Sequence, residues 1–269
     1  MELKDIFVHL DGSERSHARL DIAVALAKRH QARLTGHFAK ASAETVGVLG
    51  PRRSALDKST AEASRELFEK AAGAAGLVAT WRVTPSGEYN FVIADVVNAA
   101  RNHDLAVLGQ HDYTRADETV PPELVEQVLV ASGRPALVIP FAGEFANIGT
   151  RVLVAWNGGR EAVRAINDAL PLMMAAKEVR VVVVNPPDRA LDGEAMVGHL
   201  ACHGINAVAD TLVVEGIGIM DMLLSRAADF GSNLLVMGAH GHYGFPWLNR
   251  GAGTRHILRH MTLPVLMSH

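Results

Sequence analysis

The chain alternates short apolar runs with amphipathic helical stretches, and the whole series occurs twice. Apolar runs of this length separated by helices predict a parallel sheet that is covered on both faces, because a parallel connection needs a crossover helix. The predicted strands are 4–10, 32–39, 78–84, 104–109 and 134–140 in the first series, and 150–156, 179–186, 206–214, 233–238 and 263–269 in the second. The predicted helices are 14–30, 57–75, 89–102, 122–132, 160–176, 191–203, 218–230 and 254–260.

The two series match position by position. Gly109 and Pro135 are 26 residues apart, and so are Gly238 and Pro264. Each copy has the size of an ordinary domain. We therefore predict two domains, residues 1–142 and 148–269, joined by a linker around 141–149.

The stretch 234–256 of the second copy carries two glycine clusters. Gly238 and Gly241 follow a strand, and Gly251 and Gly253 come directly before Thr254 and a predicted helix. Glycines let a backbone approach a phosphate closely, and the N–H groups of a helix start point at it. The stretch is neither a Walker loop nor GxGxxG, so these glycines are also compatible with plain turns that bind nothing.

The spacing G-x2-G-x9-G resembles the nucleotide loop of the universal stress protein (UspA) family. The flanks NLLVMGAHGH and RHILRHMTLPVLMSH are similar to that family's fourth strand, last helix and last strand. The resemblance implies an α/β fold of two tandem flavodoxin-like or Rossmann-like domains (adenine nucleotide alpha hydrolase-like). Each domain would have a five-stranded parallel sheet with helices on both faces, and the two would pack as a pseudo-dimer.

The resemblance also implies a ligand and a site. The ligand would be ATP, ADP or AMP, with Mg²⁺ as a possible companion, bound where strand order reverses in the second copy. Asn157 would meet the adenine or ribose, the backbone of Val184 would contact adenine, and the glycine loop would contact ribose and phosphates. The implied binding residues are Ala155, Trp156, Asn157, Val184, Met237, Gly238, His240, Gly241, Gly251, Ala252, Gly253 and Thr254.

Two of these residues depart from the family's pattern. Asn157 stands where an Asp is usual, and its hydrogen bonds to a ligand would lack the added strength that a charged carboxylate gives. Ala252 stands where Ser or Thr is usual, so one hydroxyl is missing.

The first copy departs further from the pattern. Asp112 and Pro122 stand where the second and third glycines belong, and a carboxylate there would repel a phosphate. Phe38 matches Val184, and its ring could fill an adenine-sized space. We expect no phosphate site here, and Asp11 is then expected as a helix-start residue.

Composition narrows the function classes. A net charge of -3 and the absence of a Lys/Arg cluster argue against nucleic-acid binding. No apolar run reaches membrane-spanning length, and no signal peptide is expected, which favours a cytoplasmic protein. Cys202 is expected to be packed at a helix end, and Met220 to belong to the core.

Other candidate sites are weaker. His256 and His260 would share a helix face and His240 and His242 lie in the glycine loop, but no third metal ligand stands out, so no metal site is expected. Trp247, with Phe245 and Pro246, could pack against the other copy or face a partner.

We find no nucleophile with a base and expect a non-enzymatic stress-response protein with no catalytic residue. The alternatives are a partner or assembly module without nucleotide, including a homodimer, and a slow ATP hydrolase.

Overall fold

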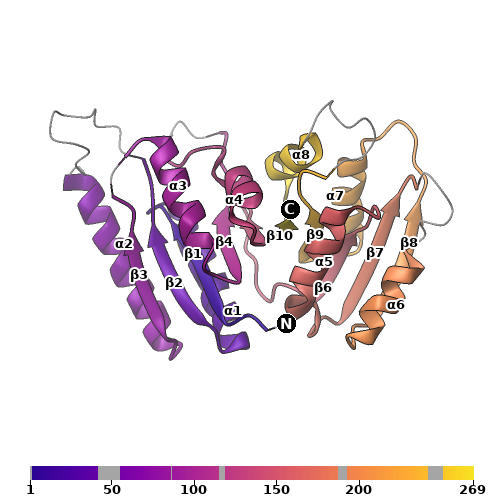
Figure 1. Ribbon diagram of the computed structural model, residues 1–269, viewed down its shortest axis with the longest axis horizontal. Helices are drawn as coiled ribbons and strands as arrows, with labels where there is room; N and C mark the ends of the chain where they lie inside the picture. Colours follow the sequence, from indigo (N-terminus) through magenta and orange to yellow (C-terminus); the bar gives the residue numbers. More distant parts are fainter. Residues whose placement is uncertain (1, 42–54, 86, 115–118, 187–192, 242–250) are drawn as a thin grey trace. The chain divides into compact units, whose positions relative to one another are not determined.

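The computed structural model describes residues 2–41, 55–85, 87–114, 119–186, 193–241 and 251–269. The chain divides into two compact units, Glu2–Glu144 and Phe145–His269, which we call the N-terminal and the C-terminal unit. Each unit is a parallel five-stranded sheet with helices on both faces (Figure 1), so the expected α/β fold is confirmed.

The N-terminal unit has the strand order β3-β2-β1-β4-β5. Its strands are β1 (Asp5–Leu10), β2 (Arg33–Phe38), β3 (Ala79–Val83), β4 (Leu105–Gly109) and β5 (Ala136–Ile139). Its helices are α1 (Arg15–His30), α2 (Ala55–Ala74), α3 (Tyr89–Ala100) and α4 (Leu124–Ser132). Helices α1 and α2 contact each other on one face of the sheet, and α3 and α4 contact each other on the other face.

The C-terminal unit repeats this order as β8-β7-β6-β9-β10. Its strands are β6 (Arg151–Ala155), β7 (Glu178–Val184), β8 (Ala207–Leu212), β9 (Leu234–Gly238) and β10 (Val265–Ser268). Its helices are α5 (Arg160–Met173), α6 (Glu194–Cys202), α7 (Ile219–Asp229) and α8 (Ala252–His260). Helix α5 packs on β9 and β10, whereas α7 packs on β7 and α8.

The central strands are apolar and buried, as parallel strands covered on both faces must be. Every residue of β1 from Ile6 to Leu10 is buried, and so are Leu234 to Met237 of β9. The outer strand β3 has no fully buried residue. The strand that leads into the glycine loop is therefore one of the best-anchored parts of the C-terminal unit.

Two details differ from the sequence-based expectation. Helix α8 begins at Ala252 and not at Thr254, because Gly251 with φ 79° closes the preceding turn and the helix starts directly after it. Cys202 is exposed, because the last turn of α6 buries Leu200 and turns residues 201–204 outward, so the expected packing of this thiol was wrong.

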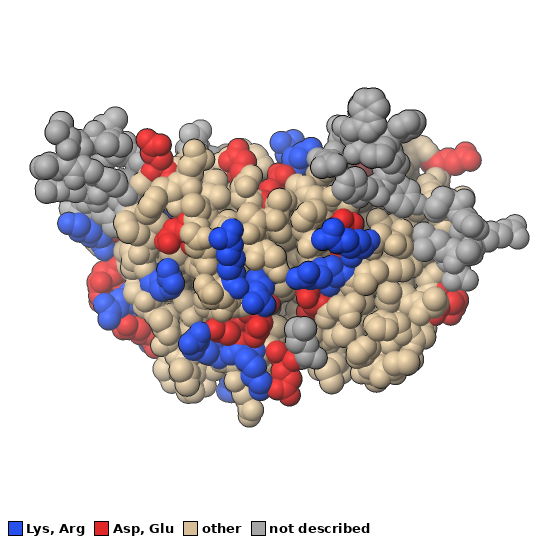
Figure 2. Space-filling view, viewed as in Figure 1, with Lys and Arg blue, Asp and Glu red and all other residues tan. Residues whose placement is uncertain are grey.

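Acidic and basic side chains lie beside one another on the face shown in Figure 2. In the part of the chain that the structure describes, no helix combines the length and the apolar character needed to cross a bilayer.

A glycine of β2 generates a stability prediction. A Cβ on Gly36 would lie 2.6 Å from the ring of Phe68, which is fully buried, whereas a Cβ on the exposed Gly73 of α2 would meet nothing within 4 Å. We expect Gly36→Ala to lower the free energy of unfolding by about 1–3 kcal/mol through overpacking. Gly73→Ala should raise it by up to about 1 kcal/mol, because alanine is the better helix former. Urea denaturation measures both, and equal effects would contradict the packing argument.

Candidate functional site

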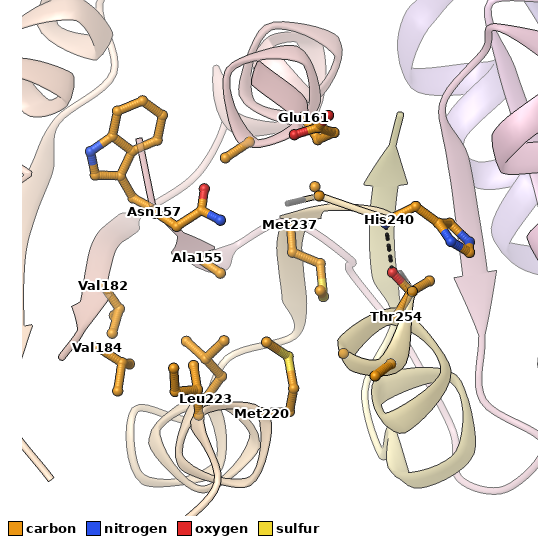
Figure 3. A pocket seen from close by; sticks show the side chains of 18 residues that line it. Ala155, Asn157, Glu161, Val182, Val184, Met220, Leu223, Met237, His240 and Thr254 are labelled. Carbon is orange, nitrogen blue, oxygen red and sulfur yellow. Dashed lines mark hydrogen bonds between the residues drawn. The ribbon is translucent and has the colours of Figure 1, made fainter. Parts of the chain in front are cut away.

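A cavity of about 310 Å³ opens at the carboxyl ends of β6 and β9 in the C-terminal unit. Strand order reverses between these two strands, which is where open α/β sheets bind ligands. All twelve residues that the sequence predicted for the site line this cavity, and six more join them (Figure 3). The lining residues are Ala155, Trp156, Asn157, Glu161, Ala162, Val182, Val184, Ile219, Met220, Leu223, Met237, Gly238, His240, Gly241, Gly251, Ala252, Gly253 and Thr254.

Gly238 lets the walls of the cavity come together. A Cβ at this position would lie 2.6 Å from the backbone nitrogen of Ala162, so any side chain would push α5 away from the end of β9. The start of α5 therefore contacts the strand end directly, and this contact forms one wall.

One end of the cavity is apolar. Val182 and Val184 come from β7, and Met220 and Leu223 come from α7 opposite them (Figure 3). Val182, Val184 and Leu223 are buried, and Met220 is half-buried. The expectation that Met220 belongs to the core therefore needs correction, because α7 turns this face toward the strand ends. Such an end can hold a flat apolar ring.

The other end is polar and is made mostly of backbone. Helix α8 starts after Gly251, and the N–H groups of Ala252, Gly253 and Thr254 precede the first intrahelical bond, which Arg255 makes to Gly251. Free amides at a helix start attract an anion, and the helix dipole adds to them. The expectation of an anion cradle thus has a concrete geometry in the first turn of α8.

Thr254 links this helix start to the end of β9. Its hydroxyl oxygen accepts a hydrogen bond of 2.8 Å from the backbone N–H of His240, and its side chain is buried. His240 has φ 53°, a left-handed conformation that is uncommon for a residue with a side chain. The hydroxyl proton of Thr254 is left to donate to a ligand.

Asn157 is oriented by its own turn. Its side-chain oxygen Oδ1 accepts the backbone N–H of Gly159 at 2.9 Å. The amide nitrogen Nδ2 is consequently the group that can meet a ligand, and it is a donor. An Asp at this position would offer only acceptors. Asn157 therefore meets a ligand with a hydrogen-bond donor where an Asp would meet it with an acceptor.

Sequence reasoning missed Glu161. It lies in the first turn of α5 and is half-buried, and Figure 3 draws it above Met237, between Asn157 and His240. Its carboxylate reaches the glycine loop, since a Cβ on Gly241 would lie 3.3 Å from its Oε2. The available signal was its place four residues after Asn157, in the first helical turn beyond the strand end.

The remaining histidine candidates do not form a metal centre in the described part of the chain. His256 and His260 share a face of α8 with ring centroids 4.3 Å apart, and His256 Nε2 lies 2.7 Å from Asp221 Oδ1. No group of three or more potential ligands that could hold a metal occurs among the described residues. The predictions for His242, Phe245, Pro246 and Trp247 lie outside the described residues.

The N-terminal unit has a cavity at the equivalent place, about 430 Å³ in volume, lined by Asp11, Arg19, Gly109, Asp112 and Pro122 among others. The guanidinium of Arg19 occupies the crevice between the strand ends and would clash with any Cβ on Gly109. Arg19 Nη2 lies 2.6 Å from Asp11 Oδ2, and both side chains are buried. A buried ion pair therefore lines this cavity at the strand ends, where the C-terminal unit has the uncharged Asn157.

The role expected for Asp11 is corrected by this pair. Asp11 lies in the turn before α1, where its Oδ1 accepts from the N–H of Ser13 and the hydroxyl of Ser16. Burial alone would raise the pKa of Asp11, but the charge of Arg19 and these hydrogen bonds hold that pKa well below its usual range. Asp11 is thus mainly the partner of a buried arginine. Phe38 lies in the core and is not part of the cavity lining.

Taken together, the chain consists of two flavodoxin-like units, each with a cavity at the point where strand order reverses, and only the N-terminal cavity is lined by the buried Arg19–Asp11 pair. Solved structures share the fold. A universal stress protein from Archaeoglobus fulgidus DSM 4304 matches with TM-score 0.74 and 18% identity, over 99% of this chain and 96% of that chain. A putative universal stress protein from Pseudomonas aeruginosa UCBPP-PA14 matches with TM-score 0.62 and 16% identity, over 99% and 93%.

A protein of unknown function from Pseudomonas aeruginosa PAO1 also matches, with TM-score 0.62 and 15% identity, over 99% of this chain and 92% of that chain. No protein-family model matches the sequence, and no curated protein matches it. Identities of 15–18% over nearly the whole length show a shared fold.

The buried ion pair generates a double-mutant prediction. Eight residues after Asn157 the C-terminal unit has Ala165, whereas eight residues after Asp11 the N-terminal unit has Arg19. We expect Arg19→Ala to lower the free energy of unfolding by about 3–5 kcal/mol, because it removes the cation that neutralises the buried carboxylate of Asp11. Adding Asp11→Asn should restore at least about 1 kcal/mol by removing that charge. Urea denaturation of the two single variants and the double variant checks this, and strictly additive effects would contradict the pairing.

His9, buried beside this pair, generates a pH prediction. Burial, and next the charge of Arg19, lower the pKa of His9 to about 4. The unfolded chain titrates near pH 6.5, so between about pH 6.5 and 4 it binds a proton that the folded chain does not. The free energy of unfolding should therefore fall on acidification through this window, by roughly 3 kcal/mol in total.

His9→Gln keeps a donor for the carbonyl of Ala39 but does not titrate. Urea denaturation at about pH 7 and pH 5 should show a flatter pH dependence for this variant, and the value at pH 7 reports the packing cost alone. An unchanged pH slope would rule out His9 as the source.

Proposed function

We propose that this chain is a cytoplasmic, tandem member of the universal stress protein family that binds an adenine nucleotide in its C-terminal unit. The observation that carries the proposal is the convergence of the twelve predicted residues on one cavity. That cavity combines an apolar end with free backbone amides at the start of a helix, which are the two features a nucleotide requires.

The proposed placement follows from these two ends. The adenine ring lies between Val184 and Leu223, and the phosphate lies against the amides of Ala252 and Gly253. The ribose then lies near Asn157, whose Nδ2 donates to a ring nitrogen or a sugar oxygen. A Cβ on Gly251 would clash with His240, which supports a loop that needs glycine to keep this shape.

The N-terminal unit is proposed to bind no nucleotide in this way. Arg19 and Asp11 occupy the crevice, and Asp112 lines its mouth. Opening this crevice for a ligand would separate a buried ion pair, which is costly.

The proposal contains no chemical step on the ligand. The slow hydrolase remains the second candidate, because Glu161 is a carboxylate near the phosphate end and carboxylates can act as general bases. Release of inorganic phosphate from ATP, abolished by Glu161→Gln, would favour the hydrolase over the binding protein.

A pair of identical substitutions tests the proposal. Val184→Phe fills the apolar end with a ring, as Phe38 stands at the matching position of the N-terminal unit. Val208→Phe makes the same change at an exposed position of β8 that does not line the cavity.

We expect titration calorimetry with adenosine and AMP to show binding to the wild type, at least about tenfold weaker binding to Val184→Phe (~1.4 kcal/mol), and unchanged binding to Val208→Phe. Analysis of the nucleotide released from denatured wild-type protein complements this measurement. Absence of any bound or titratable adenine ligand would favour the partner module instead.

A further inference from the structure

The start of α8 carries a cation at a place where helices disfavour one. Arg255 is the fourth residue of α8, and its Nη1 lies 3.1 Å from the position that a Cβ on Gly251 would take. The guanidinium thus turns back to the glycine that precedes the helix, as long helical side chains commonly do. The positive end of the helix dipole repels a cation there, and an anion bound at the same helix start would offset this repulsion.

Other donor groups gather at the same glycine. The described atoms nearest to a Cβ on Gly251 belong to His240 and Arg255, so both side chains lie against this residue. Gly251 and His240 line the cavity, and Figure 3 shows His240 beside the first turn of α8. The backbone amides that precede the first intrahelical bond of α8 follow directly after Gly251. A guanidinium, an imidazole and free amides therefore meet around one lining residue.

The carboxylate of Glu161 borders a different glycine. The described atoms nearest to a Cβ on Gly241 belong to Glu161, with Oε2 at 3.3 Å, whereas those nearest to a Cβ on Gly251 belong to His240 and Arg255. The acidic and the basic side chain are thus not interchangeable neighbours of a ligand. An anionic group bound at the start of α8 has the arginine beside the same glycine.

The matching helix start of the N-terminal unit carries the opposite charge. Arg255 comes 17 residues after Gly238, which ends β9, and Glu126 comes 17 residues after Gly109, which ends β4. Glu126 lies in the first turn of α4, where an acidic side chain is favourable to the helix dipole. Since the fold accepts the favourable acid at this position, the arginine is a property of the C-terminal pocket.

We propose that Arg255 binds the phosphate group of the ligand at the start of α8, so that the pocket selects nucleoside phosphates over nucleosides. This inference rests on the proposed function and specifies its ligand class. A guanidinium is always charged and can meet phosphate oxygens with two parallel hydrogen bonds, whereas the helix start offers a partial charge. Adenosine lacks the group that Arg255 binds, so its affinity does not depend on this residue.

The test compares adenosine with AMP by titration calorimetry in the presence of EDTA. The wild type binds AMP at least about tenfold more tightly than adenosine. Arg255→Gln weakens AMP binding by about tenfold and changes adenosine binding by less than about twofold. Arg255→Lys keeps the charge but not the planar pair of donors, and retains part of the preference. At about 1 M salt, where the Debye length is roughly 3 Å, the difference between wild type and Arg255→Gln shrinks.

A matched control lies on the same helix. Arg259→Gln removes the same charge from the last turn of α8, at an exposed position outside the cavity lining. It leaves the affinities for adenosine and AMP unchanged. Urea denaturation of both variants shows that each is folded, so that a change in affinity reports binding.

Four outcomes overturn the inference. The first is that the wild type binds adenosine as tightly as AMP. The second is that Arg255→Gln leaves AMP binding unchanged, which assigns the phosphate to the amides alone. The third is that Arg255→Gln weakens adenosine and AMP equally, which indicates a structural role. The fourth is that Arg259→Gln weakens AMP as much as Arg255→Gln does, which indicates a general effect of charge.

Failure of the proposed function itself is recognised separately. In that case neither adenosine nor AMP binds the wild type, and Val184→Phe has no effect on either of them.

Discussion

The reversal of strand order between β6 and β9 is the constraint on which the rest of the C-terminal unit depends. The chain leaves β6 toward the sheet face where α5 packs, and it leaves β9 toward the opposite face, where α8 contacts α7. Two neighbouring strand ends are consequently not bridged by one connection, and a crevice stays open between them. The start of α5 and the start of α8 both border this crevice, so the backbone donors of α8 and the side chain of Glu161 face the same space.

The same constraint operates in the N-terminal unit with another outcome. Its strand order is identical, and its cavity lies at the same place. There a side chain from α1 enters the crevice, and a carboxylate at the end of β1 neutralises it. A buried ion pair gains little net stability over an apolar replacement, yet it is costly to break. One topology thus supports a cavity lined by a buried ion pair in the N-terminal unit and a cavity with the uncharged Asn157 at the matching position in the C-terminal unit.

Much of the fold could be predicted because its signals are local. The strands are continuous apolar runs, and the glycines that end β9 and precede α8 mark the ends of the loop between these two elements. The sequence predicts a start of α8 at Thr254, two residues later than the observed start at Ala252, because glycine is a poor helix former and yet Gly253 lies within the first turn. Arg19 was not recognised because a charged residue in an amphipathic helix is normally exposed. Its place in the buried stripe of α1, with Ser16, Leu20 and Ala23, was the one local sign.

The sequence by itself determined the repeated order of strands and helices, the two glycine clusters and the residues that end each central strand, because these depend on neighbours along the chain. Only the tertiary structure decided which helical side chains reach the strand ends. Glu161, Met220 and Leu223 come from α5 and α7, and their direction depends on how each helix is rotated on the sheet. That rotation is set by packing between distant segments, such as the contact of α5 with Gly238, and no local pattern encodes it.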